Sequence, residues 1–62
     1  MAEIVFGNER MVVPDDMTIE DAVISLGKHP DAFLYLCDGR PVPMTVVIDG
    51  MKIEALRVAS GG

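Results

Sequence analysis

The residues of this sequence best suited to covalent chemistry are its last two, Gly61 and Gly62. A terminal carboxylate is unreactive at neutral pH until an electrophile such as ATP converts it into an acyl-adenylate, which a sulfur or amine nucleophile can then attack. For this step the carboxylate has to enter the buried nucleotide site of a partner enzyme, and glycine suits a narrow channel because it has no Cβ. Chance places glycine at two given positions in roughly 0.5% of chains, so the remaining residues must support this interpretation.

No other group of residues in the sequence forms a catalytic or metal-binding set. His29 has no second His, Cys or paired carboxylate at ligand spacing, so we interpret it as a solvated loop residue. Cys37 has no neighbouring His or Lys to activate its thiol and is better explained as a packed strand residue. The adjacent carboxylates at 15–16 and 20–21 suit capping and solvation, because nothing in the sequence encloses them. We therefore predict no catalytic residue, no metal and no cofactor.

The chain is 62 residues long, which is enough for one small domain but leaves no room for a catalytic pocket between lobes. It also lacks the phosphate-binding motifs GxxxxGK[ST] and GxGxxG, so activation of its carboxylate must occur in trans. We expect a carrier or modifier protein on which an enzyme acts. Half of the residues are hydrophobic, and we expect part of that apolar surface to meet a partner.

Charge and cysteine content indicate which kind of partner the protein binds and which cellular compartment it occupies. Ten acidic and five basic side chains give a net charge of −5, and Lys and Arg do not cluster, so direct nucleic-acid binding is not expected. An acidic surface fits a basic protein partner, although it also serves solubility alone. The single cysteine fits a reducing compartment. No stretch has the pattern of a signal peptide or approaches the roughly 20 apolar residues of a membrane span, so we expect a cytoplasmic protein.

The elements that must position the terminal carboxylate begin with two short β-rich runs, at 3–6 and 9–13. Gly7-Asn8, which lies between them, supplies the positive φ angles of a tight turn. Pro14 ends the second run because proline has no N–H for a strand ladder. The sequence therefore predicts a β-hairpin.

A helix is predicted after this hairpin. The hydroxyl of Thr18 is placed to accept a hydrogen bond from the backbone N–H of Asp21, as an N-cap residue does. Gly27 suits the left-handed residue that ends a helix. Apolar residues recur between them at helical spacing and form one stripe: Ile19, Ala22, Val23 and Leu26.

The second half of the chain contains two further strands and an irregular section. Residues 32–37 form a strand that is apolar on both faces, so one face meets the helix and the other meets something else. Residues 40–43 contain two prolines and cannot lie inside a sheet. Residues 44–48 suit either a short edge strand or a turn of helix, and residues 52–58 form the final strand.

This order of elements, with a C-terminal Gly-Gly at this length, resembles the β-grasp family of ubiquitin-like proteins. The more specific likeness is to sulfur carriers of the ThiS and MoaD type and to small archaeal modifier proteins. It lies in DGRPVP at 38–43 and LRVASGG at 56–62, and it covers essentially the whole chain. The resemblance implies an α+β fold, with a mixed four- to five-stranded sheet packed on one helix. It also implies a β-grasp domain at 1–57 and a flexible Gly-Gly tail at 58–62.

The resemblance further implies a chemistry for the end of the chain. Gly62 is the residue to be adenylated and converted to a thiocarboxylate, and Gly61 keeps the backbone thin beside it. The implied partners are an adenylating enzyme of the ThiF, MoeB or ubiquitin-activating class and a downstream synthase. That synthase would pass the sulfur to thiamine thiazole, to molybdopterin or to tRNA.

Two other functions stay open. An activated Gly62 is also suited to transfer onto lysine amines of target proteins, which would make the chain a protein modifier. Lys28 and Lys52 are then equal candidates for chain formation. The other alternative is a β-grasp interaction domain whose terminal glycines take part in no chemistry.

Strand alternation predicts an apolar surface beside the tail. If Ile53 and Ala55 face the helix, Leu56 lies on the opposite face of the sheet. Lys52 and Glu54 share that face. The same rule, applied to the first and third strands, places further apolar side chains there. We name the whole predicted set the open-face patch: Val5, Leu34, Leu36, Leu56 and Val58. We expect this patch to dock the activating enzyme; the alternative is that an extra segment or a second copy covers it.

Overall fold

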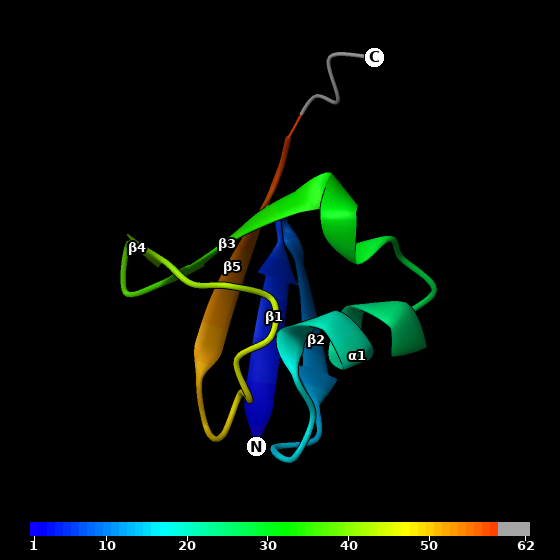
Figure 1. The fold of residues 1–62 in the computed structure, drawn as a ribbon, viewed down its shortest axis with the longest axis vertical. Coiled ribbons are helices and arrows are strands. Elements are labelled where there is room, and N and C mark those ends of the chain that lie inside the picture. The colour runs from blue at the N-terminus through cyan, green and yellow to red at the C-terminus, as the bar shows by residue number, and fades with distance from the viewer. Residues whose placement is uncertain (59–62) are drawn as a thin grey trace.

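The computed structural model describes residues 1–58, which contain five strands, one α-helix, one short 3-10 helix and the loops that join them. The elements in chain order are β1 (Ala2–Phe6), β2 (Glu9–Val13), α1 (Ile19–Ser25), the 3-10 helix η1 (Pro30–Ala32), β3 (Phe33–Cys37), β4 (Arg40–Pro41) and β5 (Lys52–Arg57). The strand order is β2-β1-β5-β3-β4, in which β1 and β5 are parallel and the other pairs are antiparallel. Figure 1 shows β1 and β5 side by side. The predicted α+β, ubiquitin-like β-grasp fold is confirmed.

The hairpin forms where the sequence predicts it. β1 and β2 pair from Ala2 opposite Val13 to Phe6 opposite Glu9, so that the turn falls on the two residues between these strands. Gly7 in that turn has a φ of +62°, a conformation in which a residue with a Cβ is strained.

The helix α1 also begins as predicted. The side-chain oxygen of Thr18 accepts a hydrogen bond from the backbone N–H of Asp21 at 3.1 Å, which satisfies one of the free donors of the first turn. The residues of α1 that are buried belong to the predicted stripe: Ile19, Ala22 and Val23. After the helix, Gly27 has a φ of +79°, as expected of the left-handed residue that ends a helix.

The segment at 44–48 is neither the edge strand nor the helical turn that the sequence suggests. It is a loop whose carbonyl groups reach the start of α1. The backbone N–H of Ile19 donates to the carbonyl of Val46 at 3.0 Å, and that of Glu20 donates to the carbonyl of Met44 at 2.9 Å. The first N–H groups of a helix have no partner within the helix itself, so this loop completes α1.

The same loop contributes to the core. Val47 forms an isolated β-bridge with Thr18, and the N–H of Ile48 donates to the carbonyl of Met17 at 3.0 Å. Ile48 is 0% exposed. The side chain of a residue outside every strand and helix is therefore as well buried as those of β1 and β5.

The proline-containing segment at 40–43 does join the sheet, which corrects the expectation of an irregular section there. Arg40–Pro41 form the two-residue edge strand β4, which pairs with the end of β3. The N–H of Val42 then donates to the carbonyl of Tyr35 at 2.9 Å. Proline is tolerated at this position because an edge strand has no second neighbour that needs its N–H.

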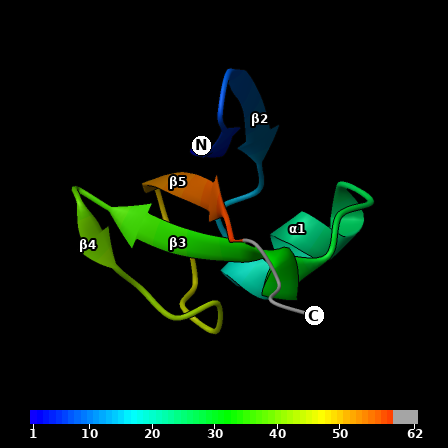
Figure 2. The ribbon, with the colours of Figure 1, turned by 90° about the horizontal axis from the view of Figure 1, so that it is seen from above.

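The core lies between α1 and one face of the sheet. Its buried hydrophobic residues are Ala2, Ile4, Phe6, Val13, Ile19, Ala22, Val23, Tyr35, Ile48, Ile53 and Ala55. Figure 2 shows α1 and the loop after β4 on one side of β3 and β5. Hydrophobic burial of this kind dominates the stability of so small a domain. The opposite face of the sheet, which we call the open face, carries no helix among residues 1–58.

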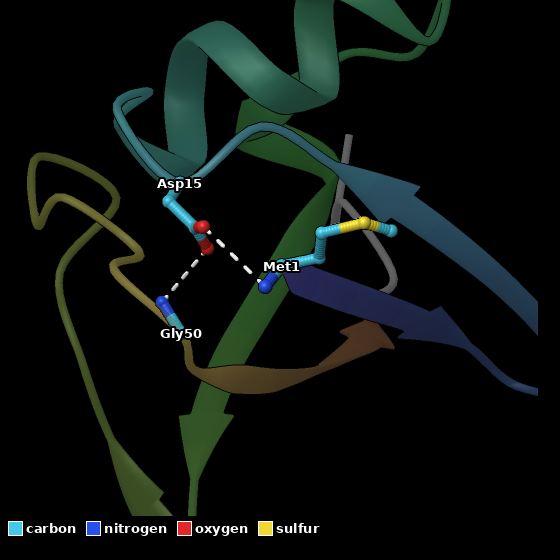
Figure 3. A network of polar contacts seen from close by, with 3 residues as sticks. All are labelled: Met1, Asp15 and Gly50. Atoms are coloured by element: carbon cyan, nitrogen blue, oxygen red, sulfur yellow. Dashed lines mark hydrogen bonds and ion pairs between the residues drawn. The ribbon is translucent and has the colours of Figure 1, made fainter.

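Polar contacts around Asp15 tie the loops at the start of β1 and β5 together (Figure 3). One oxygen of the Asp15 carboxylate accepts a hydrogen bond from the backbone N–H of Gly50 at 2.9 Å. The other lies 3.4 Å from the α-amino nitrogen of Met1. The carboxylate therefore bridges two segments that are far apart in the sequence.

Candidate functional site

The strand β5 carries the chain toward the predicted reactive end. It is a central strand, hydrogen-bonded to β1 on one side and to β3 on the other. The N–H of Val58 still donates to the carbonyl of Ala32 at 3.0 Å, so Val58 is held beside η1. Gly61 and Gly62, and the rest of the predicted tail after Val58, lie outside the described residues.

Side chains alternate along β5 as the sequence predicts. Ile53 and Ala55 are buried against α1, whereas Glu54 and Leu56 are exposed on the open face. Because β5 lies between two other strands, the open face also displays side chains of β1 and β3 beside it.

Two members of the open-face patch lie together near the point where the tail begins, and a third, Val58, follows just after the end of β5. Leu34 of β3 and Leu56 of β5 are register partners, so their side chains share one face and lie close together. Leu34, Leu56 and Val58 are 43%, 46% and 43% exposed. We call these three residues the root patch. These exposed apolar side chains lie beside the start of the tail.

The other two members, Val5 and Leu36, are arranged differently. Both are half-buried, and both are register partners of Glu54, one in β1 and the other in β3. The side chain of Glu54 therefore stands between them on the open face. Sequence reasoning placed Glu54 on this face but did not place it between two members of the patch, because that position depends on two strand registers.

A shallow hollow of about 220 Å³ lies on the open face between β1 and β5. Its lining includes Val5, Arg10, Lys52, Glu54 and Leu56. The hollow thus combines two apolar side chains with charges of both signs.

A second groove, of about 330 Å³, lies at the same end of the sheet as the start of the tail. The rings of Phe6 and Phe33 meet edge to face there, with centroids 5.1 Å apart. The amine of Lys28 lies 5.0 Å from the centre of the Phe6 ring, and Arg57 lines the groove as well. Sequence reasoning missed this groove because its residues come from separate elements.

The two lysines that were equivalent in the sequence differ in the structure. Lys28 is half-buried with its amine over an aromatic ring, whereas Lys52 is exposed at the start of β5. An amine that reacts with an activated carboxylate has to be reached by it, so Lys52 is the more accessible acceptor of the two.

Within residues 1–58, no three His, Cys, Asp or Glu side chains are grouped to hold a metal ion. Cys37 is a half-buried free thiol. Burial, together with the nearby charge of Asp31, raises the pKa of Tyr35, whose hydroxyl donates to the carbonyl of Pro30 at 2.7 Å. Tyr35 is thus held in the core by a structural hydrogen bond. In the same range, none of the helices has the length and apolar character to cross a membrane.

Comparison with characterised proteins finds one relevant similarity. The small archaeal modifier protein 2 of Haloferax volcanii is 35% identical over 52 residues, which are 84% of this chain and 79% of that protein. No family model matches the chain. No solved structure matches it significantly.

Proposed function

The chain belongs to the family of small archaeal modifier proteins, and on that basis we propose that a partner enzyme adenylates the carboxylate of Gly62 and converts it to a thiocarboxylate. The protein is of the ubiquitin-like modifier or sulfur-carrier kind. One observation carries the proposal: in this ubiquitin-like sheet the central strand is β5, and the sequence after β5 contains the two glycines at 61 and 62.

The proposed chemistry has two steps. A carboxylate oxygen of Gly62 first attacks the α-phosphorus of ATP, and pyrophosphate leaves. Hydrosulfide then attacks the acyl carbon, AMP leaves, and the sulfhydryl proton passes to solvent. The product is a thiocarboxylate in which one sulfur has replaced one oxygen. A downstream synthase transfers this sulfur to thiamine thiazole, molybdopterin or tRNA.

The adenylating enzyme, of the ThiF, MoeB or ubiquitin-activating class, docks on the open-face patch in this proposal. The root patch supports this role, because exposed apolar side chains beside the start of the tail suit an enzyme that receives the tail. Roughly half of each root-patch leucine is already covered, so burying the remainder contributes on the order of 1 kcal/mol per leucine before association costs.

A second function is favoured by a separate observation. The relative is named a modifier protein, and the same adenylate can be attacked by a lysine amine of a target protein. An isopeptide bond then forms at the Gly62 carbonyl and AMP leaves. A third possibility is an interaction domain without C-terminal chemistry.

The intact mass of the untagged protein tests the proposal. The protein is incubated with ATP, sulfide and the adenylating enzyme of its own organism, beside a variant that lacks Gly61 and Gly62. The expected result is a mass change equal to one sulfur in place of one oxygen, which the truncated variant does not show. No change, with no adenylate trapped when sulfide is omitted, would refute both kinds of C-terminal chemistry.

Peptide mapping tests the modifier function in the same samples after target proteins are added. Trypsin cleaves after Arg57, so a modified lysine carries the remnant Val-Ala-Ser-Gly-Gly from residues 58–62. Remnants on target lysines support conjugation. A thiocarboxylate without such remnants supports sulfur transfer alone.

A further inference from the structure

The charged side chain at the centre of the open face is Glu54. It lies on the central strand β5, with Val5 of β1 and Leu36 of β3 as its register partners. Leu56 follows it on the same face of the same strand. A carboxylate therefore stands among three apolar side chains on the central strand of the proposed docking surface.

The nearby cations do not pair with this carboxylate. Within residues 1–58, neither Arg10 nor Lys52 lies within ion-pair distance of Glu54. The Nε of Arg10 is 3.7 Å from a carboxylate oxygen of Glu3, and Lys52 is the register partner of the same glutamate. Glu3 thus stands next to both cations, and Glu54 remains the negative charge that faces the apolar residues.

Docking changes the environment of this carboxylate. A partner that covers Val5, Leu36 and Leu56 removes water from Glu54, and burying an unpaired charge is strongly unfavourable. A cation supplied by the partner offsets that cost, and like charges that face each other across an interface add to it. The hollow of about 220 Å³ beside Glu54 leaves room for a side chain from the partner.

We propose that Glu54 is a specificity-determining residue: the adenylating enzyme presents an Arg or Lys side chain to it across the open face. The inference rests on the proposed function, because it names a requirement on the enzyme that docks there. Glu54 thus selects among adenylating enzymes by the charge that they present to it. An enzyme with an apolar or acidic residue at that point removes water from Glu54 and offers no cation in return. Such an enzyme therefore binds the chain more weakly.

The test is the KM for this chain in ATP–pyrophosphate exchange with the adenylating enzyme of its own organism. Glu54→Lys is expected to raise the KM by at least about tenfold and to leave kcat unchanged, since it sets two cations against each other. Glu54→Gln is expected to raise it less. Asp16→Lys is the matched control, because it changes the net charge equally at an exposed residue in the turn between β2 and α1.

The test is completed by reversing the opposite charge on the enzyme. One Arg→Glu or Lys→Glu substitution on the enzyme is expected to restore the KM of Glu54→Lys. The inference is overturned if Glu54→Lys behaves like Asp16→Lys. It is also overturned if Lys52→Glu, rather than Glu54→Lys, raises the KM, because the partner then presents an anion to this face. A wild-type chain that the enzyme never adenylates refutes the proposed function itself, and this inference with it.

Discussion

Replacing the two leucines of the root patch with serine, as Leu34→Ser and Leu56→Ser together, should weaken docking of the adenylating enzyme. The two residues are 43% and 46% exposed, so docking removes about half of each side chain from water. Fully burying a leucine contributes about 1.5–3 kcal/mol, and the remaining half of each contributes about 1 kcal/mol. Loss of about 2 kcal/mol corresponds to an increase in KM of about 30-fold.

The assay is ATP–pyrophosphate exchange at varied concentration of the chain, with thermal unfolding of each variant measured in parallel. The matched control is Val47→Ser with Ile24→Ser. These residues are 49% and 55% exposed, but Val47 lies in the loop beside the start of α1 and Ile24 lies in α1 itself, so neither belongs to the open face. A KM for the root-patch variant within about threefold of the control value would show that docking does not use this surface.

Two further changes test the fold. Ile48→Ala should lower the free energy of unfolding by about 2–5 kcal/mol, as other buried Ile-to-Ala changes do, because Ile48 is 0% exposed in the core; urea unfolding measures it, and a loss below about 1 kcal/mol would contradict the packing of the loop at 44–48. Tyr35→Phe tests a pH dependence. The folded-state pKa of Tyr35 is raised above its ordinary value of 10.0, so its contribution to stability is fully present below that pH and is lost as the pH rises through the folded-state value. Wild-type stability should therefore fall in that alkaline range, and the decrease should be smaller in Tyr35→Phe, which also loses the hydrogen bond to Pro30 at every pH; equal decreases in both proteins would refute the assignment.

Features that depend on neighbouring residues were predictable from the sequence. The hairpin turn at Gly7 needs a positive φ angle, and the cap at Thr18 needs an oxygen three residues before an N–H, so a few adjacent residues decide both. Strand alternation likewise indicated which side chains of β5 face the helix. The order of the elements, with the likeness of residues 38–43 and 56–62 to a known family, indicated the fold as a whole.

Features that depend on distant residues were not predictable in this way. The loop at 44–48 has its conformation because the free N–H groups of Ile19 and Glu20 need acceptors, and those donors are far away in the sequence. β4 exists because β3 leaves an open edge where a proline is tolerated. Periodicity within 44–48 or 40–43 carries no information about either requirement.

The sequence by itself determined the order of the hairpin, the helix and the two later strands β3 and β5, the outward face of β1, β3 and β5, and the presence of Gly61 and Gly62, since propensity and alternation act over a few residues. Only the tertiary structure decided which side chains are neighbours on the open face. The parallel register of β1 with β5 and the antiparallel register of β3 with β5 place Glu54 between Val5 and Leu36. Register is set by packing of the whole sheet on α1, and a shift of one residue in either strand would place a different side chain there.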